Sequence, residues 1–211
     1  MSEITEPELR EAGLNLADKP REVREQLESD VFGFWAFLMS DAVIFALLFV
    51  IYGTMENATA GGPVPQHEFT FHSAFCETAL LLTSSFTYGM VSLSLKHARR
   101  RLWPALWLAV TFCLGAGFLM MEIHDFLTMF RDGATPERSG YFSSFFVLVG
   151  THGFHVCSGL VWIVLMGIQL AVFGLDQRTR INLVRLGLFW HFLDIVWVVI
   201  FSVVYLGAFI R

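Results

Sequence analysis

Seven ionisable residues lie inside long apolar stretches of this 211-residue sequence. They are Asp41, Glu77, Glu122, His152, His155, His191 and Asp194. Carboxylates and imidazoles bind metals, ligate haem iron and transfer protons, so these residues are the candidates for chemistry. Even on lenient insertion scales, a charged side chain at the centre of a bilayer costs about 2.5–3.5 kcal/mol. Their presence indicates either a functional site or polar contacts that hold helices together.

Two pairs among these residues have the spacing of neighbours on a helix. His152 and His155 are three positions apart and therefore share one helix face. His191 and Asp194 have the same spacing, and an aspartate can orient a neighbouring imidazole. Glycines beside the first pair predict close approach of another helix: Gly150, Gly153 and Gly159.

A metal or haem site would need more than these spacings. Di-iron helix bundles use Glu-x-x-His motifs on two helices, but Glu122 is followed three positions later by Asp125. His155 and His191 remain an alternative pair of haem ligands if they face each other across two helices. A proton or ion pathway is a second alternative. We favour a hydrogen-bonded polar network between helices, and we expect this chain to bind no metal or redox cofactor of its own.

The composition indicates that these residues are positioned by membrane helices. Hydrophobic residues make up 55% of the chain and charged residues 16%, against about 25% charged in soluble domains. The mean hydropathy is +0.58. A span needs about 20 apolar residues, and backbone groups in lipid must bond internally, so the long stretches predict helices. Five stretches qualify: about 31–55, 69–95, 104–127, 141–173 and 183–210. Three separated cysteines inside them, Cys76, Cys113 and Cys157, are expected to be small buried hydrophobes.

The charges predict the orientation and a separate tail. Residues 1–30 hold nine acidic and four basic residues and predict an acidic cytoplasmic tail before the membrane domain, 31–211. With the N-terminus in the cytoplasm, eleven Lys and Arg fall on the cytoplasmic side and three outside, which favours this orientation and a periplasmic C-terminus. No basic face is large enough for nucleic acid.

Eight short motifs, which span all five stretches, give the sequence a resemblance to a known family. They are Phe32–Asp41 (FGFWAFLMSD), Ala60–Pro63 (AGGP), Glu77–Leu82 (ETALLL), Ser85–Met90 (SFTYGM), Gly115–Phe118 (GAGF) with Met121-Glu122, Thr151–Val156 (THGFHV), Ser158–Trp162 (SGLVW) and Phe189–Trp197 (FWHFLDIVW). Together they resemble subunit III of haem–copper terminal oxidases. The five-helix form with FGFWAFLMSD and AGGP looks most like the cytochrome o ubiquinol oxidases of bacteria.

The resemblance implies an all-α, five-helix bundle of the oxidase subunit III type in the bacterial inner membrane. It implies a non-catalytic subunit of a proton-pumping quinol oxidase that supports assembly, lipid binding and sustained turnover. Haem and copper would lie in subunit I, the main partner, beside subunits II and IV and bound phospholipid. Mitochondrial relatives carry a buried glutamate where this chain has Asp41. Asp41 is therefore either a packing contact or a carboxyl that helps deliver protons.

Three other functions stay open at the level of the sequence. The nearest is subunit III of a cytochrome c oxidase of the shorter bacterial type. A small transporter is disfavoured because helices interrupted by proline are not predicted, and Pro104 lies at a helix start. The last is an independent enzyme with its own metal.

Overall fold

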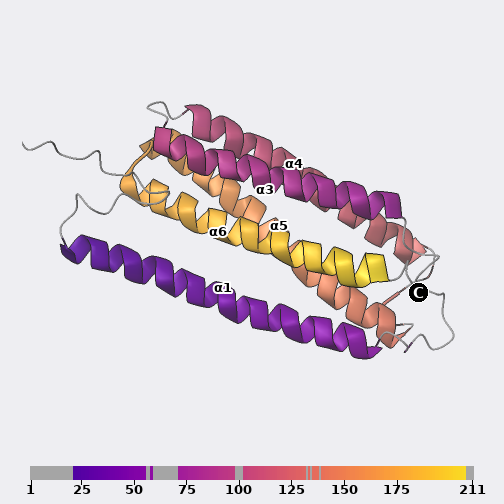
Figure 1. The fold of residues 1–211 in the computed structure, drawn as a ribbon. Coiled ribbons are helices and arrows are strands. Elements are labelled where there is room, and N and C mark those ends of the chain that lie inside the picture. Colours follow the sequence, from indigo (N-terminus) through magenta and orange to yellow (C-terminus); the bar gives the residue numbers. More distant parts are fainter. Residues whose placement is uncertain are drawn as a thin grey trace, which may run out of the picture.

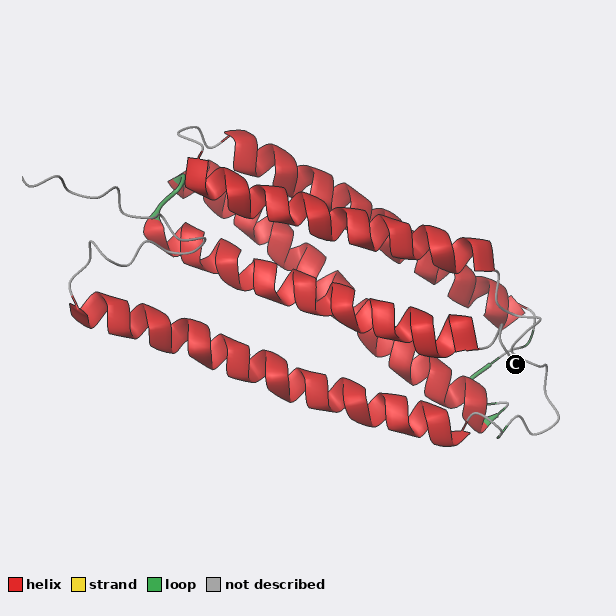
Figure 2. Ribbon diagram, in the orientation of Figure 1, coloured by secondary structure: helices red, strands yellow, loops and turns green. Residues whose placement is uncertain are grey.

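A computed structural model of the chain describes residues 21–55, 58, 71–97, 102–131, 133, 135–137 and 139–207. All regular secondary structure within these residues is helical (Figure 2). Most of the predicted acidic tail, the AGGP motif and the basic residues 99–101 lie outside the described residues.

The helices confirm the five predicted membrane stretches. The elements are α1 (Arg21–Met55), α3 (Phe71–His97), α4 (Leu102–Arg131), α5 (Gly140–Phe173), α6 (Gln177–Ile200) and a terminal π-helical turn η1 (Phe201–Leu206). Five segments of the described chain are long and apolar enough to cross a membrane: Val31–Met55, His72–Leu95, Leu102–Arg131, Gly140–Phe173 and Arg178–Leu206. The chain is therefore a multi-pass membrane protein.

Three helices extend beyond the stretches that the sequence predicts. Helix α1 begins at Arg21, ten residues before Val31, within the predicted tail. Helix α4 continues to Arg131, and α6 already begins at Gln177. The extensions of α1 and α6 are rich in Glu, Gln or Arg, which are good helix formers but lower the local hydropathy, and the extension of α4 ends in Arg131. Hydropathy therefore locates the apolar span and not the helix end.

Helix α1 lies at the edge of the bundle and packs on α5 and α6 (Figure 1). Helix α3 packs on α4 and α6, while α5 packs on α4 and α6. The face of α1 toward the bundle is made of residues three, four or seven positions apart, as a helix requires: Leu38, Asp41, Phe45 and Tyr52. Among the described helices, α5 and α6 are therefore the main neighbours of candidate residues on α1.

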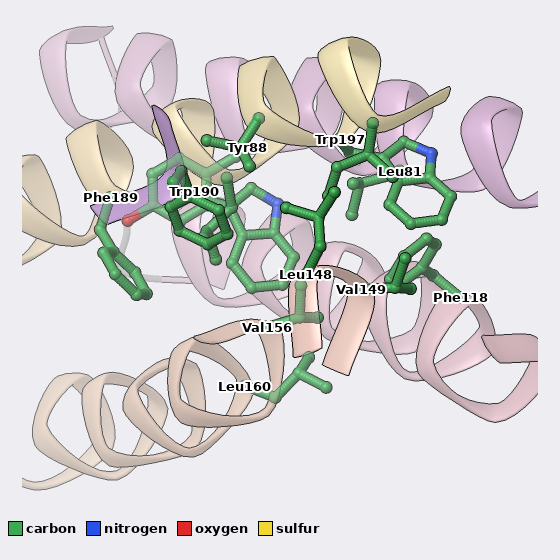
Figure 3. Close-up of a cluster of buried hydrophobic side chains, with 14 of the residues drawn as sticks. Leu81, Tyr88, Phe118, Leu148, Val149, Val156, Leu160, Phe189, Trp190 and Trp197 are labelled. Atoms are coloured by element: carbon green, nitrogen blue, oxygen red, sulfur yellow. The ribbon is translucent and has the colours of Figure 1, made fainter. Parts of the chain in front are cut away.

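Large aromatic residues form the centre of the bundle (Figure 3). The rings of Phe118 and Trp197 pack edge to face with their centroids 4.6 Å apart. Trp190 lies about two helical turns before Trp197 and is almost completely buried. Its ring lies so close to Gly115 that a Cβ atom there would stand 2.8 Å from two ring carbons. A small residue is therefore required where α4 passes this tryptophan.

Many large apolar side chains on the outside of the bundle are exposed. On α1 they include Phe32, Trp35, Val43, Leu47 and Val50. An apolar surface of this extent is stable against lipid tails or another protein rather than water. The bundle thus presents the surface expected of a membrane protein.

Candidate functional site

The carboxyl group of Asp41 on α1 meets the imidazole of His155 on α5. Asp41 Oδ1 lies 3.3 Å from His155 Nε2, and Asp41 is only 6% exposed. The other ring nitrogen, His155 Nδ1, lies 2.7 Å from the backbone carbonyl oxygen of Thr151. The Phe45 ring packs on the same imidazole at 5.3 Å between centroids. This contact is a polar tie between α1 and the rest of the bundle.

The hydrogen bonds of His155 restrict where its protons lie. The Thr151 carbonyl oxygen can only accept, so His155 Nδ1 carries a hydrogen and donates it. Nε2 then either accepts a hydrogen from a neutral Asp41 carboxyl or donates one to a carboxylate. In both arrangements one proton lies between Nε2 and Asp41 Oδ1, and the net charge of the pair is zero. The neutral arrangement avoids the desolvation of buried charges, whereas the ion pair has to offset that desolvation by the attraction between its two charges.

His152 has different surroundings, although it lies on the same helix as His155. Its ring packs between Trp197, at 5.3 Å, and Phe118, at 5.9 Å. His152 is completely buried, and neither ring nitrogen has a hydrogen-bond partner among the described residues. The shared spacing of the two histidines thus brings both to the interior but into separate environments.

Glu77 on α3 and Glu122 on α4 lie within range of electrostatic interaction with each other and with Asp125. They are 1% and 3% exposed. The Glu122 carboxyl lies directly against the backbone of α5, because a Cβ atom at Gly153 would be 2.9 Å from Glu122 Oε1. Gly153 thus makes room for a carboxyl group, which is a more specific role than the close helix approach predicted from the sequence.

Ser85 of α3 joins the predicted pair His191 and Asp194 on α6. Its Oγ lies 2.7 Å from His191 Nδ1, and the Asp194 carboxyl interacts with the same hydroxyl group. A hydroxyl group has one hydrogen and can accept others, so Ser85 can donate to one of these partners and accept from the other. Ser85, on another helix, is therefore a common neighbour of His191 and Asp194 that the sequence did not indicate.

The seven candidate residues are thus spread over several interfaces. Among the described residues, no three His, Cys, Asp or Glu side chains are grouped so that they could hold a metal ion. The contacts of His155 and His191 give no support to the alternative that the two rings face each other across a haem. His155 is engaged with Asp41 on α1, whereas His191 is engaged with Ser85 on α3.

Hydroxyl groups of α3 form polar contacts that the sequence analysis missed. Trp197 Nε1 donates to Thr78 Oγ1 at 3.0 Å, and Trp190 Nε1 donates to Ser84 Oγ at 3.1 Å. The Tyr88 hydroxyl donates to the Leu183 carbonyl at 2.7 Å. Residue numbers of these partners increase along α3 while those on α6 decrease, as antiparallel helices require. The sequence holds no clear signal for these pairs, because the two tryptophans are seven positions apart whereas Thr78 and Ser84 are six apart.

The fold and these contacts define a class: a five-span membrane bundle whose buried polar groups join its helices. The family is shown by comparison with known proteins. The model of the family described as cytochrome c oxidase subunit III matches residues 18–209, and the chain belongs to this family. The expectation drawn from the short motifs is therefore confirmed.

Individual relatives of the chain are named as subunits of two kinds of oxidase. The chain is 47% identical to the cytochrome bo(3) ubiquinol oxidase subunit 3 of Pseudomonas aeruginosa over 176 residues, which cover 83% of this chain and 84% of that protein. It is 40% identical to the quinol oxidase subunit 3 of Bacillus subtilis, with 84% and 86% covered. It is also 41% identical to the cytochrome c oxidase subunit 3 of Bacillus sp. strain PS3, with 82% and 84% covered.

Proposed function

We propose that this chain is the non-catalytic subunit III of a haem–copper ubiquinol oxidase in the bacterial inner membrane. The observation that carries the proposal is the family match over residues 18–209, together with relatives at 47% and 44% identity that are named as ubiquinol oxidase subunits. In such an assembly, haem and copper lie in subunit I, and subunits II and IV complete the complex. The independent enzyme and the small transporter have no comparable support.

The buried contacts support a structural role for the polar residues. Asp41 of α1 meets His155 of α5, and Ser85 of α3 meets His191 and Asp194 of α6, so these side chains make polar contacts between helices. Polar contacts between membrane helices contribute about 0.6–2 kcal/mol each. A set of them can fix the positions of helices that have little hydrophobic driving force to associate within lipid.

The surface of the bundle supports contact with subunit I and with phospholipid. Between residues 31 and 55, helix α1 buries one face in the bundle and exposes large apolar residues on the other. We place the contact with subunit I and the bound lipids on exposed apolar faces of this kind. The membrane domain in this proposal is 31–211, and residues 1–30 form the acidic cytoplasmic tail.

Purification through an affinity tag on this chain tests the proposed function. In mild detergent, the chain is expected to bring haem- and copper-containing subunits with it, and the preparation should consume oxygen with ubiquinol as the electron donor. A chain that purifies without haem-containing partners contradicts the proposal. A preparation that oxidises cytochrome c but not ubiquinol assigns the chain to the other kind of oxidase.

The proposed orientation is tested separately by reporter fusions. A reporter after Arg211 is expected to report a periplasmic location, and one inserted at residues 98–101 a cytoplasmic location, because eleven of fourteen basic residues would then lie inside. Fusion to an enzyme active only in the periplasm measures this directly. The opposite pattern of activity would show that the charge distribution does not set the topology.

A further inference from the structure

The buried carboxyl groups of Glu77 and Glu122 have no role in the contacts that join the helices. Glu77 Oε1 and both carboxyl oxygens of Glu122 are buried without a hydrogen-bond partner among the described residues. Within the residues that the structure describes, neither carboxyl group forms an ion pair with a lysine or arginine. Native proteins leave few buried polar atoms unsatisfied, so three such atoms on two adjacent carboxyl groups require an explanation.

The hydrogen bond between Ser73 and Asp125 joins α3 to α4, and Glu77 and Glu122 each lie one turn further along these antiparallel helices, at the same interface. Two carboxylates close together in an apolar interior repel each other and lose their hydration. A single proton held between the two groups removes the repulsion, because the protonated carboxyl then donates to the other. The remaining oxygen lone pairs still need donors, and water is the usual donor to buried polar groups of this kind. Gly153, which lies against the Glu122 carboxyl, has no side chain that could donate a hydrogen bond in place of water.

A line of polar groups leads from the surface of the bundle to this pair. Asp125 lies one turn beyond Glu122 on α4, and its side chain is 27% exposed. Asp125 Oδ2 accepts a hydrogen bond from Ser73 Oγ at 2.8 Å, and Ser73 lies one turn before Glu77 on α3. Asp125 Oδ1 lies 3.5 Å from Nδ1 of the exposed His124. These groups lie at the end of the bundle where α4 ends and α5 begins.

We propose that Glu77 and Glu122 form a hydrated site that holds one shared proton and exchanges it with solvent past Asp125 and Ser73. The ligand is water together with a proton, not a metal ion. The site is distinct from the Asp41–His155 contact, which joins α1 to α5. The proposal concerns residues of this chain alone and does not depend on the identity of the electron donor.

Other ionisable groups around the site come from α5 and η1. Tyr205 on η1 interacts electrostatically with Glu77, Glu122 and Asp125, and with Tyr141 on α5. The Tyr141 hydroxyl lies 3.1 Å from the Tyr52 hydroxyl of α1. Phenolic hydroxyl groups can donate to or accept from water, so they extend the network without adding charge. His152 precedes Gly153 and faces the rings of Phe118 and Trp197.

Infrared difference spectroscopy of the purified complex tests the shared proton. Glu77→Gln and Glu122→Gln keep the size of each side chain but remove its acid. At neutral pH, the spectrum of each variant should lack the carbonyl stretch of the protonated carboxyl that the parent shows. Both variants should lose the same band, because one proton serves the two groups. Glu137→Gln, at an exposed position between α4 and α5, is the matched control and should leave this band unchanged. Loss of no band, or of a different band in each variant, would overturn the shared proton.

Deuterium exchange tests whether water reaches the site, both in the unaltered protein and in a variant that keeps Glu77 and Glu122. In the unaltered complex transferred to D2O, the same band should shift to lower frequency as the proton is replaced. Asp125→Asn should keep the band and slow its shift, because the partly exposed carboxyl at the entrance is lost. A band that never shifts in D2O would overturn access by water. A shift of unchanged rate in Asp125→Asn would overturn the proposed route.

Discussion

Replacement of His155 by leucine is expected to lower the free energy of unfolding by about 1–3 kcal/mol, because the buried Asp41 carboxyl loses its partner. Asp41→Leu should cost less, since His155 is 20% exposed and keeps its bond to the Thr151 carbonyl. The double variant should lose less than the sum of the two, because it leaves neither group unpaired. Reversible unfolding in detergent measures all three. His124→Leu, at an exposed position, is the control and should stay within about 0.5 kcal/mol of the parent.

Losses that simply add in the double variant would contradict the contact between Asp41 and His155. Asp41→Asn then separates a packing role from a proton role, because asparagine keeps the size and hydrogen-bonding groups but cannot exchange a proton. A packing role predicts normal assembly and turnover of the complex at all accessible pH values. A normally assembled variant whose turnover falls only at high pH would instead give Asp41 a role in proton delivery.

Gly115→Ala is expected to lower the free energy of unfolding by about 1–3 kcal/mol, the usual cost of overpacking a core. The added methyl group would lie 2.8 Å from two Trp190 ring carbons and 3.1 Å from Leu160. Trp190 cannot move away easily, since its ring is buried and its Nε1 donates to Ser84.

Gly167→Ala on α5 provides the matched control for this substitution. No atom of the described residues lies within 4 Å of the added methyl group, so this variant should be neutral or up to about 1 kcal/mol more stable than the parent. Thermal unfolding in the same detergent compares the two variants. Equal stability of both would contradict the close packing of α4 against Trp190.

The membrane spans could be predicted because the thickness of the bilayer sets the length of an apolar helix. Their ends could not, because charged residues such as Arg21 and Arg178 continue a helix outside the apolar layer as easily as they end one. The spacing of His152 and His155 gave their common helix but not their partners. A partner such as Asp41, more than a hundred residues away, depends on how α1 is rotated against α5.

The contacts of α3 with α6 illustrate the same limit. Serine and threonine inside apolar stretches commonly bond to their own helix, as Thr78 also does with the Ala74 carbonyl. Their sequence positions therefore do not reveal that Thr78 accepts from Trp197. Only the antiparallel register of the two helices pairs them. The residues that could do chemistry were identifiable by type, whereas their grouping into separate interfaces required the fold.

The central claim is that the buried histidines and carboxylates of this chain bind no redox centre. Absorption spectra and metal content of the chain, purified without other subunits and then within the complex carrying His152→Leu, test it most directly. We expect neither haem absorption nor stoichiometric metal in the lone chain, and an unchanged haem spectrum in whatever variant complex assembles. Stoichiometric haem or metal in the lone chain, or selective loss of one haem signal at normal yield of the complex, would contradict the claim.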